Sequence, residues 1–129
     1  MSKPIVLEIE GVRLEGHLEE SSAAEALAER LPLEVKVQRW GDEYYGSLGA
    51  PLGHFEGETA QIMAVGELAY WDPGNALCLF FGPTPASLGG EPRAASPVHR
   101  IGQVEGDWVA VKALGPSVVA RLMVGGVGE

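Results

Sequence analysis

The feature that most constrains this fold is a short apolar run, Ala76–Phe81, placed just after the Asp-Pro-Gly-Asn corner of Asp72–Asn75. The run is too short to cross a bilayer, which takes about 20 apolar residues, so it must be buried against the rest of the chain. A second apolar run, Leu68–Trp71, precedes the corner. Proline presets a turn, and the glycine after it accepts the positive φ angle needed next. We therefore predict two neighbouring strands joined at this corner, with Ala76–Phe81 as a central strand covered on both faces.

Apolar and polar residues alternate with a period of two, which is typical of half-buried strands, along most of the chain. Ile5–Ile9 and Val12–Leu18 flank a glycine-containing turn and predict an antiparallel hairpin. Further strands are predicted at Leu33–Val37, Tyr44–Leu48, Gln61–Val65, Val98–Val104, Trp108–Ala113 and Val118–Val124. Short strands at regular spacing favour a sandwich or barrel, and closure removes exposed edges. We predict a mainly β protein, a closed barrel of about eight strands.

One segment has the helical period instead. Ser22 and Glu25 have the spacing of a capping box, and Leu27 and Leu31 lie on one face of the helix that follows. A helix this short is marginal by itself, so it must dock this apolar stripe on the sheet. Pro32 ends it. We predict one short α-helix over an end of the barrel.

Two segments lie outside this pattern. Gly82–Pro97 holds four of the nine prolines and predicts a long surface loop, of a length that is often functional or mobile. The glycine-rich residues 125–129 predict a flexible tail. The 129 residues suit one domain with a single core, which we place at residues 1–124.

The charge balance bears on partners and location. The chain has 18 acidic and 9 basic residues, a formal net charge of -9. Such a surface repels a phosphate backbone and an anionic membrane, so we expect neither nucleic acid nor membrane as a partner. The N-terminus lacks a basic segment followed by an apolar stretch and a cleavage site, which leads us to expect a cytoplasmic protein.

Residues able to carry reactive or metal chemistry are few. Cys78, the single cysteine, allows no intrachain disulfide, and in its apolar run it is expected to be an inert core thiol with a raised pKa. His17, His54 and His99 lack the spacing of zinc ligands. His54 and Glu56 share a loop and would need a third ligand, so we expect a solvated pair. We predict no metal and no cofactor.

Three stretches resemble a bacterial and archaeal family of small cyclophilin-like proteins. They read GDEYYGSLGAP, GELAYWDPGNALCLFFGPTP and VHRIGQV, and the resemblance extends over most of the chain. It implies an eight-stranded barrel with the cyclophilin topology, in agreement with the strand count. It implies no established activity, because the members of this family are largely uncharacterised.

A second similarity concerns Val98–Gly102, which is similar to the Phe-His-Arg-Val-Ile strand of true cyclophilins, whose arginine stabilises a twisted prolyl amide. The similarity implies Arg100 as the catalytic residue of a weak peptidyl-prolyl cis-trans isomerase, acting on a barrier of ~18–20 kcal/mol set by amide resonance. The Gly-Gln-Gly-Gly segment of cyclophilins does not follow Ile101. The alternative is a chance similarity, with Arg100 paired to a carboxylate and the aromatic residues filling the barrel.

Three functions follow from these patterns. The first is a non-enzymatic binding module whose outer groove, rimmed by the Asp72–Asn75 corner and the Gly82–Pro97 loop, accepts a peptide or small molecule. Its predicted binding residues are Tyr70, Trp71, Asn75, Phe81 and His99. The second is the weak isomerase, acting on a proline-containing peptide. The third is a structural or interaction subunit that forms a homodimer.

Overall fold

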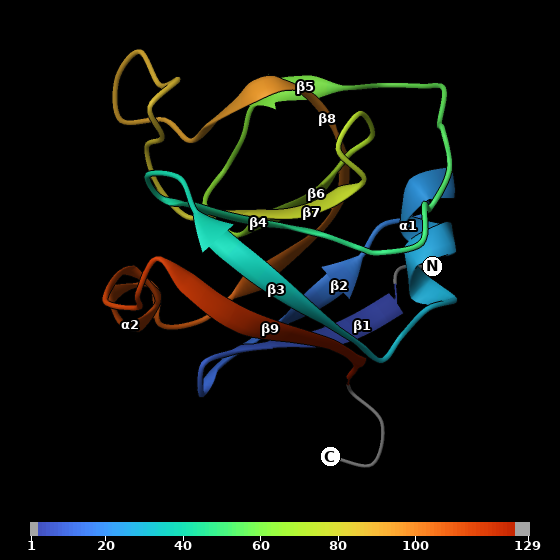
Figure 1. Ribbon diagram of the computed structural model, residues 1–129, viewed down its shortest axis with the longest axis horizontal. Coiled ribbons are helices and arrows are strands. Elements are labelled where there is room, and N and C mark those ends of the chain that lie inside the picture. The colour runs from blue at the N-terminus through green and yellow to red at the C-terminus, as the bar shows by residue number, and fades with distance from the viewer. Residues whose placement is uncertain (1–2, 126–129) are drawn as a thin grey trace.

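The computed structural model describes residues 3–125, which form nine strands and two short helices (Figure 1). The strands are β1 (Lys3–Ile9), β2 (Val12–Leu18), β3 (Leu33–Arg39), β4 (Glu43–Ser47), β5 (Ala60–Ile62), β6 (Glu67–Trp71), β7 (Ala76–Phe80), β8 (Arg93–Glu105) and β9 (Ser117–Val124). The helices are α1 (Ser22–Ala28) and α2 (Trp108–Lys112). The predicted flexible tail lies outside the described residues except for Gly125, whose amide donates to the carbonyl of Pro4 at 2.9 Å.

Eight of the strands close into a ring. Their order is β2-β1-β9-β3-β4-β7-β6-β8, and β2 pairs again with β8. Every pairing is antiparallel. The predicted closed barrel is therefore confirmed, and β5 is an extra strand that pairs with the first part of β8 outside the ring.

Inward-facing side chains fill the barrel. Tyr44, Tyr70 and Phe81 lie among aliphatic residues of all the surrounding strands, and each is at most 1% exposed. A void of about 10 Å³ is left among them, which holds no more than one water molecule. The interior is thus a packed core, and a ligand has to bind elsewhere.

The Asp72–Asn75 corner joins β6 to β7. All five residues of β7 are buried and the strand lies between β4 and β6, as predicted. The positive φ angle, however, falls on Asn75 (φ 49) and not on Gly74. Gly74 is needed for another reason: a Cβ atom there would lie 2.3 Å from the indole ring of Trp71. The glycine allows this ring to lie flat on the turn.

The predicted helix forms, but its cap lies one residue earlier than expected and it ends at Ala28, so Leu31 lies beyond it and Pro32 does not end it. Ser21, not Ser22, is the N-cap, and its hydroxyl accepts the amide of Ala24 at 3.2 Å. Leu27 is fully buried, and the helix packs against β8 and β2 at one end of the barrel. Docking of the apolar face decides where the helix lies, as predicted from its periodicity.

Two further sequence predictions were wrong. Trp108–Ala113 was predicted as a strand, but the Asp107 carboxylate caps the amide of Ala110 at 3.1 Å and starts helix α2. Only Val111 of this helix is buried, so its alternating pattern did not mark a sheet. The predicted loop Gly82–Pro97 is shorter than expected, because β8 already begins at Arg93. Neither described helix is long and apolar enough to cross a membrane.

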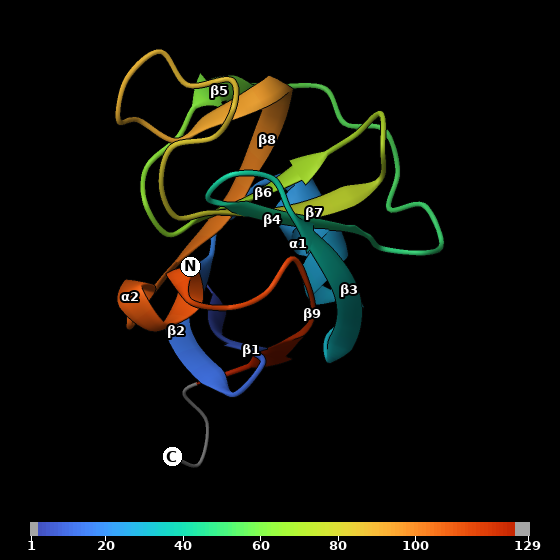
Figure 2. The same ribbon diagram turned by 60° about the vertical axis from the view of Figure 1, so that its left-hand side comes forward.

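A second layer stands on the outside of the barrel. β5 and the first part of β8 form an arch over the outer face of β4, β7 and β6 (Figure 2). Small and apolar side chains fill part of the space between the arch and the sheet; the buried ones are Met63, Ala69, Ala76, Cys78, Phe80, Ala94 and Val98. The candidate site lies where this outer core opens to solvent.

Candidate functional site

A cleft of about 290 Å³ opens between the arch and the outer face of the barrel. Its volume is close to the lower limit for ligand pockets in proteins, so it suits a small molecule or a single side chain. Aromatic and small apolar residues make up most of the wall, with one carboxylic acid among them. The lining residues are Trp40, Glu43, Tyr45, Trp71, Cys78, Ala95, Ser96 and Val98.

Strand alternation places the floor of the cleft. Successive residues of a strand face opposite sides, so Tyr44 enters the barrel while Glu43 and Tyr45 on β4 face outward. Cys78 on β7 is directly opposite Tyr45 in the register. The floor is therefore the outer face of the same central strands whose inner face forms the core.

Trp71 forms a wall that is held at both ends. Its Nε1 donates a 2.8 Å hydrogen bond to the hydroxyl of Ser96 on β8, and its six-membered ring lies against Gly74 in the corner. The indole thus connects β6 to the arch. A wall that is held in this way before a ligand binds lowers the cost of binding.

Glu43 is the unusual residue of the cleft. It is 6% exposed, and burial raises its pKa from 4.5 to about 7, against a smaller lowering by a hydrogen bond with Cys78. Within residues 3–125, no ion pair joins it to a cation. Buried carboxylates are normally paired, and shifted pKa values gather at functional sites. Glu43 therefore marks this cleft as the candidate site.

The thiol beside it has no sign of reactivity. Cys78 is 3% exposed, and both its burial and the neighbouring Glu43 raise its pKa well above 9.0. A nucleophilic cysteine needs a lowered pKa and access. The structure agrees with the prediction of an inert core thiol.

Of the predicted binding residues, Trp71 lines the cleft, whereas Tyr70 and Asn75 hold the architecture. Tyr70 faces the barrel interior and its hydroxyl donates to Oδ1 of Asn75 at 2.8 Å. The same Oδ1 accepts the amide of Leu52 at 3.1 Å, and Nδ2 donates to the carbonyl of Gly49 at 3.0 Å. The corner is thus the anchor of the long loop between β4 and β5.

Phe81, another predicted binding residue, lies inside the barrel. Its ring is stacked on Tyr44, with centroids 5.4 Å apart, and on Trp108 at 6.4 Å. The guanidinium carbon of Arg39 is 5.2 Å from its centroid. Phe81 closes one end of the barrel and does not reach the cleft.

His99 and Arg100 lie at a different hollow, of about 220 Å³, between α1 and the loop before β5. The ring of His99 packs edge-on against Phe55, with centroids 6.3 Å apart. The Arg100 Nε is 2.9 Å from a carboxylate oxygen of Glu67, and its NH2 group donates to the carbonyl of Ile62 at 2.9 Å. The five predicted binding residues and Arg100 are therefore distributed over separate places.

His54 shows why its loop is a poor metal site. Its Nδ1 is 2.7 Å from a carboxylate oxygen of Asp72, and its Nε2 is 3.3 Å from one of Glu56. The two carboxylates thus bind opposite nitrogens of one ring and do not converge. In the described part of the chain, no group of three or more metal-ligating side chains gathers.

Three residues of the cleft were not predicted from the sequence: Glu43, Trp40 and Tyr45. The alternation that places Glu43 and Tyr45 on one face is present in the sequence. Nothing in the local sequence marks Glu43 as buried, however, because the arch that covers it is contributed by residues about fifty positions away. Such a non-local cover has no local sequence signal.

The ring of eight strands and the outer cleft define a small single-barrel protein of the cyclophilin type. A family model described as cyclophilin-like matches residues 3–119. The chain therefore belongs to the cyclophilin-like family, which confirms the resemblance seen in the sequence.

Two solved structures have the same fold. The hypothetical protein AF2241 from Archaeoglobus fulgidus, a solution structure, is 29% identical, with 96% of this chain and 95% of that chain covered and a TM-score of 0.79. McbB in complex with tryptophan is 15% identical, with 97% of this chain and 45% of that chain covered and a TM-score of 0.72. A comparison with curated proteins found no significant match.

Proposed function

We propose that this protein is a binding module that accepts a small molecule or one side chain of a peptide in the cleft between β4, β7 and the arch. The observation that supports this most directly is the buried, cation-free carboxylate of Glu43 at the base of a cleft lined by aromatic residues. A few convergent polar groups in an otherwise apolar pocket are typical of ligand sites.

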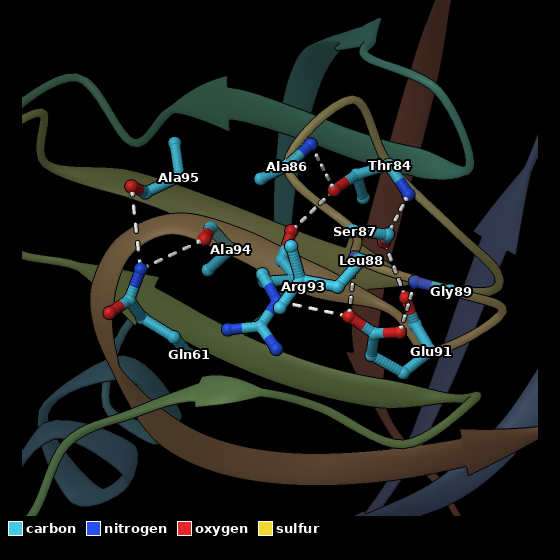
Figure 3. Close-up of polar contacts among 10 residues, drawn as sticks. All are labelled: Gln61, Thr84, Ala86, Ser87, Leu88, Gly89, Glu91, Arg93, Ala94 and Ala95. Carbon is cyan, nitrogen blue, oxygen red and sulfur yellow. Dashed lines mark hydrogen bonds and ion pairs between the residues drawn. The ribbon is translucent and has the colours of Figure 1, made fainter.

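The order of the adjoining segment supports a preformed site. Figure 3 shows how the loop before β8 is held by its own side chains. The Glu91 carboxylate accepts the amides of Leu88 and Gly89, both at 2.9 Å, and Nε of Arg93 at 3.0 Å. These donors lower the pKa of Glu91 to about 2. The chain therefore enters the arch, and the cleft wall at Ala95, from a fixed position.

The fold neighbours are consistent with a binding role. McbB, which shares this fold, has been solved in complex with tryptophan. A barrel of this type is therefore compatible with a small-molecule ligand. At 15% identity the two proteins share the fold alone, so tryptophan is not proposed as the ligand of this chain.

An isomerase is less well supported. Catalysis by Arg100 would need its guanidinium beside a prolyl nitrogen, whereas Glu67 and the carbonyl of Ile62 already hold it. Arg100 also lies outside the lining of the aromatic cleft. A binding module requires no such rearrangement. The homodimer stays a prediction.

The test is a titration of isotopically labelled protein with two probes, 2-phenylethanol and the peptide acetyl-Gly-Phe-Gly-amide, followed by amide chemical shifts. We expect shifts at Tyr45, Trp71 and Ser96. Ala95→Trp, at an exposed position of the cleft wall, should remove them by filling the space. Ala113→Trp, also at an exposed position but at the end of α2, should not. Shifts that are absent with both probes, or that survive Ala95→Trp, would overturn the proposal.

A further inference from the structure

We propose that the cleft is selective for organic amines, whose ammonium group pairs with Glu43 while the apolar part lies among Trp40, Tyr45 and Trp71. This inference rests on the proposed function and names its ligand class. Two observations support it: no cation of the protein pairs with Glu43 within residues 3–125, and aromatic residues line the cleft beside it.

Glu43 needs a cationic partner that the neighbouring segments do not supply. A buried carboxylate is costly unless a positive partner accompanies it. The arginines of the neighbouring segments are already used: Arg39 is 2.7 Å from Asp42, and Arg100 is 2.9 Å from Glu67. Glu43 is 6% exposed and lines the cleft. A cation that completes this site therefore has to come from a ligand.

The aromatic walls of the cleft also favour a cation. Tryptophan gives the strongest cation–π attraction of the aromatic side chains, and tyrosine also contributes. Trp40 and Trp71 line the cleft together with Tyr45, so an ammonium group near Glu43 has aromatic rings on its other sides. A carboxylate ligand, by contrast, meets the negative ring faces and Glu43, and the net charge of -9 disfavours its approach.

Protonation of Glu43 should compete with the binding of an ammonium group. The titratable groups that face Glu43 are Cys78 from β7 and Tyr45 from β4, while Asp42 and Glu67 nearby are occupied by arginines. Since Glu43 is partly protonated near neutral pH, an ammonium group has to displace its proton. Amine affinity should therefore increase between pH 6 and pH 8, where an alkylammonium group, with a pKa of ~10 like lysine, stays charged.

The experiment compares three probes that share a phenyl ring: phenethylamine, 2-phenylethanol and 3-phenylpropionate. Dissociation constants are measured from amide shifts on the unmodified protein at pH 8. We expect phenethylamine to bind at least about tenfold more tightly than 2-phenylethanol, which corresponds to one ion pair of about 1.4 kcal/mol. We expect no binding of 3-phenylpropionate at the cleft.

Variants then locate the effect. Glu43→Gln should reduce phenethylamine binding to the level of 2-phenylethanol and abolish the pH dependence. Glu105→Gln, an exposed acid at the end of β8, makes the same charge change outside the cleft and should alter nothing. If 2-phenylethanol binds but phenethylamine binds no tighter, the amine inference is wrong while the proposed function stands. If no probe binds at the cleft, both the amine inference and the proposed function are wrong. The measurements on the unmodified protein alone distinguish these two outcomes.

Discussion

The hydroxyl of Tyr70 and the side-chain oxygen of Asn75 are joined by a 2.8 Å hydrogen bond inside the corner between β6 and β7. Asn75 is also the residue that adopts the positive φ angle of this turn. Its amide group then reaches the loop after β4. The Asp-Pro-Gly-Asn sequence next to the most apolar strand is therefore explained by architecture: one turn residue fixes the hairpin and anchors a loop that is distant in sequence.

Replacing Asn75 should destabilise the protein. Asn75→Ala removes the partners of Tyr70, Leu52 and Gly49 and also strains the backbone. At about 1 kcal/mol for each hydrogen bond we expect a loss of about 2–4 kcal/mol in urea unfolding. Asn75→Gly accepts the same φ angle, so it isolates the hydrogen bonds. An Asn75→Gly protein as stable as the parent would show that these bonds contribute nothing.

The stability of the protein should depend on pH through Glu43. Its pKa is raised in the folded state, from 4.5 to about 7, so the folded protein holds this proton more tightly than the unfolded chain. The free energy of unfolding therefore falls as pH rises from about 4.5 to about 7. Each unit of pKa difference between the folded and unfolded states corresponds to about 1.36 kcal/mol. The full loss of unfolding free energy over this pH range is therefore about 3 kcal/mol.

Glu43→Gln should remove this dependence. Relative to the parent, the variant should become more stable as the pH is raised from 5 to 8, with the difference measured by denaturant unfolding at each pH. Glu105→Gln serves as the control, and its curve should run parallel to that of the parent. Parallel curves for Glu43→Gln as well would contradict a raised pKa.

The loop before β8 should resist acid. Because the amides of Leu88 and Gly89 and the Arg93 guanidinium stabilise the ionised form of Glu91, its pKa is lowered to about 2. The contribution of Glu91 to loop order is thus complete above pH 4.5 and is lost as the pH falls through about 2. The amide signals of Leu88 and Gly89 should titrate near pH 2. A midpoint near 4.5 would mean that the carboxylate does not hold the loop.

Arg100→Ala should lower the stability of the protein. The substitution deprives Glu67, which is 8% exposed, of its cation. Because the Arg100 side chain is itself 41% exposed, we expect a modest loss of about 1–2 kcal/mol. Arg121→Ala breaks a pair whose side chains are 59% and 58% exposed and should cost less than about 1 kcal/mol.

A protease-coupled assay with a proline-containing peptide examines the catalytic role of the same residue. We expect no turnover above the uncatalysed rate for the parent or for Arg100→Ala. Measurable turnover in the parent that disappears in Arg100→Ala but persists in Arg121→Ala would establish the isomerase instead.

Most of the barrel could be predicted from the sequence, because inward-facing residues of its strands are apolar and alternate with polar ones. The pattern is clear in β9, where Val118, Ala120 and Leu122 are buried, and in β2, where exposed residues alternate with buried or half-buried ones. It failed at α2, where the Asp107 cap decided the backbone and the apolar Val109 is 80% exposed. It also failed at the start of β8, whose small residues and Pro97 have little strand character of their own.

The site was harder to predict than the barrel. Tyr70 and Phe81 were identified as aromatic residues near the corner, but inward and outward positions exchange with every residue, and both face the core. Glu43 becomes a buried acid only because Ala95 and Val98 of the arch are placed over β4 and β7. That placement is a product of tertiary pairing between β5 and β8.

β8 has thirteen residues and belongs to both layers: its second half completes the ring and its first half carries the roof of the cleft. The roof of the cleft is consequently continuous with a strand of the barrel wall. Widening the cleft would bend a strand that also closes the cylinder. The closure of the barrel should therefore limit how far the roof can move away from β4 and β7, and with it the size of a ligand that the cleft accepts.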